Sequence, residues 1–321
     1  MADKNATIDN NLNPFCKEAQ AWLVLKKKGP AIIYQDELLS IEEYIYNWEM
    51  TISQMRDHKN RLWMMQSLAD FLDNQVCHEK FGSKPRIESL ITDFNILQKI
   101  HQRVATYKLT DAEKSSLGDC LSLIQKPEEE FVLSLLENYP ADQLYLVHGD
   151  CHSLNCLYDK TAQKLIFIDY EFATLNPFLT DIAYICNECL FDYQVPKFPY
   201  YRYEKSAAIP EAQVQEMIKT LLVFWDHPHL RLRKFDTAEK FDSEIRTWPE
   251  FNSPKWSEGL IEGYMMQIRK MKVLNNYFCV LWTLWGVRNG DVEFDYVSYG
   301  RDRAENYLDS KRELLGYLGK A

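Results

Sequence analysis

The spacing of apolar positions divides the chain into a short stretch with strand character and a long, mainly helical remainder. Alternating patterns predict strands over 31–34 and 38–46, joined by a polar turn at 35–37. Elsewhere apolar residues recur at helical intervals. These intervals predict helices over 15–28, 51–74, 89–106, 111–138, 181–191, 211–225, 235–246, 256–289 and from about 294–298 toward 315. We expect a small N-terminal unit over 1–47 and a larger helical unit over 48–321.

One segment in the middle of the chain departs from the helical pattern. The apolar run 144–147 predicts a short buried strand, and 165–168 predicts a second strand after a turn at 159–161. We therefore expect a β-hairpin over 144–172 with polar residues where its two strands end. These residues are His148, Gly149, Asp150 and Asn155 after the first strand, and Asp169 and Glu171 after the second.

The order of these polar residues matches what phosphoryl transfer from a nucleotide requires. Such transfer needs a base for the acceptor hydroxyl and oxygen ligands for magnesium. Protein kinases supply them as H-R-D, four residues and N, followed later by D-F-G. Here the order is His-Gly-Asp ending at Asp150, four residues, Asn155, and then Asp-Tyr-Glu beginning at Asp169. The Gly after His148 and the Glu in place of the last Gly point to kinase-like enzymes that act on small molecules.

Composition and charge narrow the class of protein. The chain is 46% hydrophobic and 26% charged, which is ordinary for a globular protein with a large core. Its net charge of −10 argues against non-specific binding to nucleic acid. We expect no signal peptide and no stable membrane insertion, because the first residues are polar and no long apolar run follows. The eight cysteines lack a disulfide framework, which predicts a cytoplasmic protein, and the Cys186–Cys189 pair has no partner pair.

Four separate segments together resemble the choline/ethanolamine kinase family, from about Glu18 to the C-terminus. They are His148-Gly149-Asp150 with Asn155, Ile168-Asp169-Tyr170-Glu171-Phe172, Asp181-Ile182-Ala183 with Glu188, and Leu281-Trp282-Thr283-Leu284-Trp285 with Glu293, Phe294 and Tyr299. The resemblance implies an α+β, bilobal protein-kinase-like fold with a reduced N-terminal lobe and a large helical C-terminal lobe. It also implies a phosphotransferase that uses ATP and Mg²⁺, with an alcohol as acceptor.

The motifs predict a role for each polar residue of the central segment. Asp150 is the candidate catalytic base, which accepts a hydrogen bond from the acceptor hydroxyl. Asn155 and Asp169 are the expected magnesium ligands, with Glu171 holding a second ion directly or through water. His148 is expected to brace the loop and His152 to be exposed and incidental. We expect the carboxylate of Asp181 to tie the catalytic loop down without binding metal.

Aromatic residues indicate the substrate class. A quaternary ammonium donates no hydrogen bond, so ring faces and a carboxylate at moderate distance must hold it. By resemblance the choline pocket is lined, beside Asp150, by Phe172, Glu188, Tyr193, Tyr200, Trp282, Trp285, Phe294 and Tyr299. Two tryptophans three residues apart are expected to share a helix face. Without the family pattern, the same tryptophans and tyrosines would more simply fill a helical core.

The resemblance places the adenine of ATP at a hinge after the strand near 41–45, against the backbone of Glu43, Tyr44 and Ile45, with Asp169 near the phosphates. The chain departs from the family pattern at three points. Tyr184 stands where an Asn is usual, and Thr180 where a Phe is usual. The first glycine is Gly29, so we expect no glycine-rich phosphate loop in this chain, and Glu18 falls where the partner of the phosphate lysine is usual.

Three functions stay open from the sequence. The first is ATP- and Mg²⁺-dependent phosphorylation of choline to phosphocholine, which leads to phosphatidylcholine. The second is an ethanolamine kinase or a dual enzyme. The third is a catalytically impaired binding or regulatory protein, because the missing glycine-rich loop would weaken ATP binding. Family members are often dimers, so a homodimer is expected beside the small-molecule partners.

Overall fold

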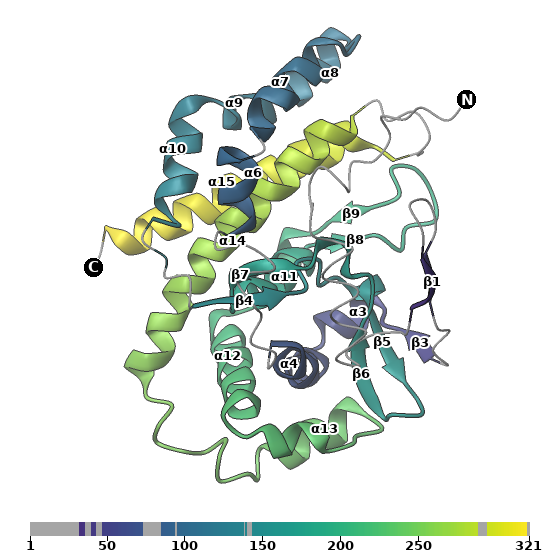
Figure 1. Ribbon diagram of the computed structural model, residues 1–321, viewed down its shortest axis with the longest axis vertical. Helices are drawn as coiled ribbons and strands as arrows, with labels where there is room; N and C mark the ends of the chain where they lie inside the picture. The colour runs from purple at the N-terminus through teal and green to yellow at the C-terminus, as the bar shows by residue number, and fades with distance from the viewer. Residues whose placement is uncertain are drawn as a thin grey trace.

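The computed structural model describes residues 32–35, 40–42, 47–72, 85–93, 95–137, 139, 143–287 and 294–319 (Figure 1). The predicted helix over 15–28, Glu18, Gly29 and the hinge residues Glu43, Tyr44 and Ile45 lie outside the described residues.

Most of the described chain is helical, as the apolar spacing predicted. The helices are α3 (Ile52–Arg56), α4 (His58–Leu72), α6 (Arg86–Thr92), α7 (Ile96–Ala105), α8 (Asp111–Ser116), α9 (Gly118–Leu123), α10 (Lys126–Ser134), α11 (Thr180–Glu188), α12 (Glu211–Asp226), α13 (Ala238–Ile245), α14 (Glu258–Gly286) and α15 (Tyr296–Leu318). Three long predicted helices are divided. Between α3 and α4, for example, Asp57 has an extended backbone and its carboxylate accepts from the backbone N–H of Lys59 at 2.9 Å. Such a side-chain acceptor starts a new helix.

The strands are short: β1 (Ile32–Gln35), β2 (Ser40–Glu42), β3 (Asn47–Glu49), β4 (Leu144–Val147), β5 (Cys156–Asp159), β6 (Lys164–Phe167), β7 (Thr174–Pro177), β8 (Phe191–Asp192) and β9 (Arg202–Tyr203). The predicted pairing of 144–147 with 165–168 is wrong. The hairpin is β5–β6, and β4 pairs antiparallel with β7. The Asp159 carboxylate accepts from two backbone N–H groups of the turn, so β5 folds back locally. The loop from His148 to Asn155 therefore connects two sheets.

Helix α11 lies in the interior, and every residue from Thr180 to Glu188 is buried. It packs against the long helix α14, which also packs along α15, α12 and α7 (Figure 1). Helix α4 packs on α12, α13 and β6. The site is thus bounded by α11, α14 and α15 on one side and by the β4–β5 loop on the other.

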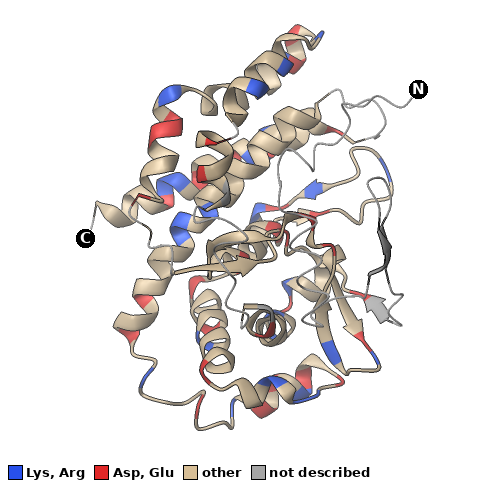
Figure 2. Cartoon of the chain, in the orientation of Figure 1, with Lys and Arg blue, Asp and Glu red and all other residues tan. Residues whose placement is uncertain are grey.

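Charged side chains of both signs are interspersed over the described helices (Figure 2). Among the described residues, no helix is both long enough and apolar enough to cross a lipid bilayer.

Gly300 allows α15 to approach α14 closely. A Cβ at this position would lie 2.8 Å from Thr283 Cγ2, and Thr283 is fixed by its hydroxyl, which donates to the Cys279 carbonyl at 2.7 Å. We predict that Gly300→Ala lowers the free energy of unfolding by about 1–2 kcal/mol, because overpacking exceeds the gain in helix propensity. Urea denaturation measures the change. Gly263→Ala is the control, since a Cβ there meets nothing within 4 Å. It should raise stability by about 0.5–1 kcal/mol, and equal effects of the two changes would contradict the packing argument.

Candidate active site

Two backbone N–H groups of the β4–β5 loop are fixed by one buried carboxylate. Asp181, in the first turn of α11, accepts from the N–H of His148 through Oδ2 and from that of Gly149 through Oδ1, each at 2.9 Å. Gly149 has a φ of 76°, which a glycine adopts without strain. The predicted structural role of Asp181 is confirmed by these contacts.

The ring of His148 connects the same loop to the end of β6. Its Nε2 lies 2.7 Å from the carbonyl oxygen of Ile168, and its Nδ1 lies 3.2 Å from the backbone N of Asp150. The Nε2–H tautomer therefore satisfies both contacts, with Nε2 donating and Nδ1 accepting. Burial lowers the pKa of His148, which favours this neutral form. His148 braces the loop, as the sequence predicted.

Asp150 lies at the turn of this loop with its carboxylate partly buried. The Asn155 amide donates to Asp150 Oδ2 at 2.9 Å and to the Asp150 carbonyl at 3.1 Å. Burial alone would raise the pKa of Asp150, but His152, His148 and the hydroxyl of Tyr184 outweigh it and lower that pKa to about 2. Asp150 is therefore ionised at neutral pH.

His152 is not the exposed, incidental residue that the sequence predicted. Its side chain is only 19% exposed, and Nε2 lies 3.4 Å from Asp150 Oδ2. Burial by itself would lower the pKa of His152, yet the facing Asp150, Glu188 and Asp169 raise it. Because the loop turns back at Ser153–Asn155, His152 lies beside the carboxylate of Asp150.

Asp169 follows the end of β6 with a left-handed backbone (φ 62°), and Glu171 lies in the short 3₁₀ turn Tyr170–Phe172. Burial and the neighbouring Asp150 raise the pKa of Asp169. The negative charge of Asp150 thus raises the cost of ionising Asp169, and a bound cation would lower this cost.

These polar groups line one end of a cavity of about 420 Å³. Its other end is aromatic. The cavity is lined by Asp150, His152, Leu154, Asn155, Asp169, Glu171, Phe172, Tyr184, Glu188, Tyr193, Phe278, Cys279, Trp282, Phe294, Tyr299 and Arg303. Oxygen-bearing groups and ring faces thus line the same cavity.

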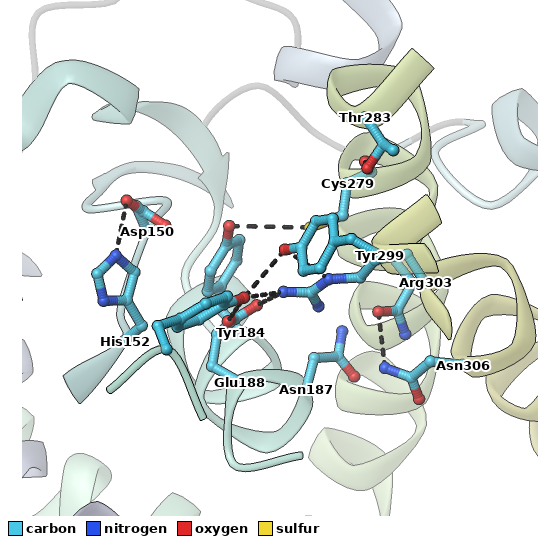
Figure 3. A network of polar contacts seen from close by, with 12 residues as sticks. Asp150, His152, Tyr184, Asn187, Glu188, Cys279, Thr283, Tyr299, Arg303 and Asn306 are labelled. Atoms are coloured by element: carbon cyan, nitrogen blue, oxygen red, sulfur yellow. Dashed lines mark hydrogen bonds and ion pairs between the residues drawn. The ribbon is translucent and has the colours of Figure 1, made fainter. Parts of the chain in front are cut away.

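A buried ion pair lies in the aromatic end. Arg303 Nη2 is 2.5 Å from Glu188 Oε1, and the two side chains are 1% and 2% exposed. Arg303 also donates to the hydroxyl of Tyr299 (Figure 3) and to that of Tyr193. The carboxylate that the sequence assigned to a ligand cation is therefore paired with a cation of the chain itself.

Comparison with known proteins agrees with this geometry. The family model described as choline/ethanolamine kinase matches residues 17–308. The chain belongs to the choline/ethanolamine kinase family.

Individual members are distant in sequence. Choline kinase alpha of Mus musculus is 21% identical over 266 residues, which are 81% of this chain and 48% of the mouse protein. The chain spans about half the length of the curated relatives that it matches. A choline kinase from Cryptosporidium parvum Iowa II has a TM-score of 0.67 at 19% identity, covering 95% of this chain and 79% of that one. A Plasmodium vivax ethanolamine kinase has a TM-score of 0.65 at 16% identity, covering 92% and 73%. The protein-kinase-like fold is thereby established.

The cavity brings together most residues that the motifs singled out. Of the predicted substrate residues, the lining set contains Asp150, Phe172, Glu188, Tyr193, Trp282, Phe294 and Tyr299. Trp285 and Tyr200 are not among the residues that line this cavity. A step of three residues leaves two side chains about 60° apart around a helix, and Trp285 faces α7, where the Arg103 guanidinium lies 4.9 Å from its ring. Tyr200 follows Pro199 with a φ of 67°, and its ring packs edge-on against Phe198.

Six lining residues were not among the predicted site residues: His152, Leu154, Tyr184, Phe278, Cys279 and Arg303. Spacing carried a usable signal for two of them. Arg303 lies four residues after Tyr299 on α15, and Phe278 lies four residues before Trp282 on α14, so each shares a face with a predicted pocket residue.

The oxygen set suits Mg²⁺, although no ligand is part of the structure. With Asn155 Nδ2 engaged by Asp150, the amide oxygen is the Asn155 atom left to bind a cation. Asp169 and Glu171 add hard carboxylate oxygens in the same cavity. Within the described part of the chain, no three His, Cys, Asp or Glu side chains form a preformed metal cage.

The Asp150–His152 contact makes stability depend on pH. The pKa of His152 is higher in the folded state than in the unfolded state. Its charged form therefore stabilises the fold at a pH below the unfolded-state pKa, and this stabilisation is lost as the pH rises through the folded-state pKa. We predict that His152→Gln lowers the free energy of unfolding by about 1 kcal/mol near pH 5.5, and by clearly less near pH 9. Urea denaturation at both values measures it. The exposed His229→Gln is the control, and a loss for His152→Gln that is independent of pH would contradict the ion pair.

Proposed function

We propose that this chain catalyses the ATP- and Mg²⁺-dependent phosphorylation of the choline hydroxyl, forming phosphocholine for phosphatidylcholine synthesis. One observation carries the proposal: an ionised carboxylate, Asp150, and a set of aromatic rings line the same cavity. An amino alcohol has the matching form, with a hydroxyl at one end and a cationic head group at the other. Membership of the family supports the reaction class.

Asp150 orients the acceptor. Its ionised carboxylate accepts a hydrogen bond from the choline hydroxyl and aligns that oxygen for attack on the γ-phosphorus. A pKa of about 2 makes Asp150 a weak base. In a loose transition state the hydroxyl proton is transferred late, so orientation is the larger part of its contribution. Asn155 holds the carboxylate in place through the 2.9 Å bond from its amide.

Asn155, Asp169 and Glu171 would hold the magnesium that accompanies ATP. When bound, Mg²⁺ neutralises charge on the phosphate oxygens. The adenine contacts at Glu43, Tyr44 and Ile45 stay a prediction, as do the homodimer and the cytoplasmic location.

Ethanolamine is the alternative acceptor, alone or beside choline, since the relatives include both kinds of kinase. A coupled assay of ADP formation with choline, with ethanolamine and without acceptor separates these activities. ADP formation that no acceptor stimulates would contradict the proposal and favour an impaired, binding or regulatory protein.

The assigned role of Asp150 makes a specific prediction. Asp150→Asn keeps the size of the side chain but removes its charge, so phosphocholine formation should fall by about 10²–10⁴-fold. The Kd of choline should change by less than about tenfold, because the ring faces are untouched. Turnover measurements and calorimetry test the two parts. Asp111→Asn, on a fully exposed side chain of α8, is the matched control and should change neither. Retention of most of the turnover by Asp150→Asn would remove Asp150 from this role.

Asp169 should control the magnesium requirement. Asp169→Asn removes one anionic ligand, so the Mg²⁺ concentration for half-maximal rate should rise by about tenfold or more. Initial rates over a magnesium titration at fixed ATP measure this, with the exposed Asp119→Asn as control. An unchanged magnesium curve for Asp169→Asn would argue that Asp169 does not bind the ion.

A further inference from the structure

The head-group end of the cavity already contains a cation, the guanidinium of Arg303. This residue belongs to α15 and is 1% exposed. Its guanidinium carbon lies 3.7 Å from the ring centroid of Phe191 and 5.0 Å from that of Tyr299. The arrangement is the one that aromatic rings offer to a cationic ligand, here used by a side chain of the protein.

Arg303 donates through Nη2 and Nε to a connected set of acceptors (Figure 3), while its buried Nη1 has no hydrogen-bond partner among the described residues. Arg303 Nη2 donates to Glu188 Oε1 at 2.5 Å and to the Tyr193 hydroxyl at 2.6 Å. Arg303 Nε donates to the Tyr299 hydroxyl at 2.8 Å. The Tyr193 hydroxyl donates to Glu188 Oε2 at 2.7 Å and lies 2.9 Å from the Tyr299 hydroxyl, which can donate to it. Both carboxylate oxygens and both phenol oxygens therefore already accept a hydrogen bond.

These hydrogen bonds determine which groups the aromatic end of the cavity offers to a ligand. The negative charge of Glu188 is balanced by Arg303 at contact distance in a buried environment. Strong acceptors in the cavity remain at its other end, where Asp150, Asn155, Asp169 and Glu171 lie. What the aromatic end still offers to a ligand is chiefly ring faces, including those of Trp282, Phe294 and Tyr299.

Head groups differ in what they need from such a surface. A primary ammonium carries three N–H donors, and burying them without acceptors costs free energy. A quaternary ammonium has no N–H donor and is stabilised by ring faces alone. Because its acceptors are engaged by Arg303 and Tyr193, this network penalises a primary ammonium and not a quaternary one.

We propose that Arg303 is a specificity-determining positioning residue. By engaging Glu188, Tyr193 and Tyr299, it leaves an aromatic surface that selects a fully N-alkylated ammonium over a primary one. The inference rests on the proposed function, because it assumes that the cationic end of an amino alcohol binds in this part of the cavity.

Calorimetry with choline, N,N-dimethylethanolamine and ethanolamine tests this in the full chain. We expect the wild type to bind choline at least about tenfold more tightly than ethanolamine, with the dimethyl compound between them. Arg303→Met releases the acceptors of Glu188 and Tyr193 for an –NH₃⁺ group. The choline-to-ethanolamine affinity ratio should then fall by at least about tenfold. If Arg303 had a purely structural role, Arg303→Met would weaken the binding of both ligands alike and leave the affinity ratio unchanged.

Matched variants make the result specific. Arg303→Lys keeps the ion pair with Glu188 and should keep the preference for choline. Arg301→Met removes a half-exposed arginine of the same helix, which pairs with Asp302, and should change nothing. Should Arg303→Met fail to fold, Tyr193→Phe decides the question. It keeps the ring but removes the donor to Glu188 Oε2, so the ratio should again move toward ethanolamine.

The outcomes separate the two proposals. If the wild type binds neither choline nor ethanolamine, the proposed function fails. If the wild type prefers choline but a folded Arg303→Met or Tyr193→Phe leaves the ratio unchanged, the inference about Arg303 is overturned and the kinase proposal stands. Equal affinity of the wild type for both ligands also overturns the inference.

Discussion

One face of helix α11 places the polar side chains of Asp181, Tyr184 and Glu188 in the protein interior. The arrangement of the site follows from the hydrogen-bond partners that these buried side chains require. They are spaced by three and four residues, so they follow one line along the helix. A buried carboxylate is unfavourable unless it is paired and hydrogen-bonded. Asp181 is satisfied by two N–H groups of the loop, and Glu188 by Arg303 and Tyr193. The helix thus couples the loop from His148 to Asn155 at its start to the aromatic end of the cavity at its end.

This coupling explains the electrostatic character of the cavity. Because Asp181 and the neutral ring of His148 fix the loop, Asp150 stays next to His152 and Asn155 and remains ionised. Because Glu188 is neutralised locally, the unbalanced negative charge is concentrated around Asp150 and Asp169. The cavity therefore has an anionic end and an aromatic end, which is the separation that the proposed choline substrate requires.

The sequence predicted the chemistry of the site better than its packing. The spacing from Asp150 through Asn155 to Asp169 and Glu171 is a local property, and these residues do line one cavity. The pairing of β4 with β7 was missed because these strands are about thirty residues apart in the sequence. The short turn between β5 and β6 makes those two strands pair with each other, and β4 pairs with β7 instead. Arg303 was missed because an arginine on a long helix is normally solvated. Its burial follows from the close approach of α15 and α14 at Gly300. Trp285 was expected in the pocket because it lies three residues after Trp282, but two side chains at this spacing can contact different neighbours.

The central claim is that one cavity joins a hydroxyl-orienting carboxylate to a head-group pocket made of rings. The most direct test is phosphorus NMR of the products formed from equimolar choline and ethanolamine with ATP and Mg²⁺. We expect a phosphocholine resonance that grows together with ADP and exceeds that of phosphoethanolamine. Predominant phosphoethanolamine, or ADP and inorganic phosphate without either phosphoester, would contradict it.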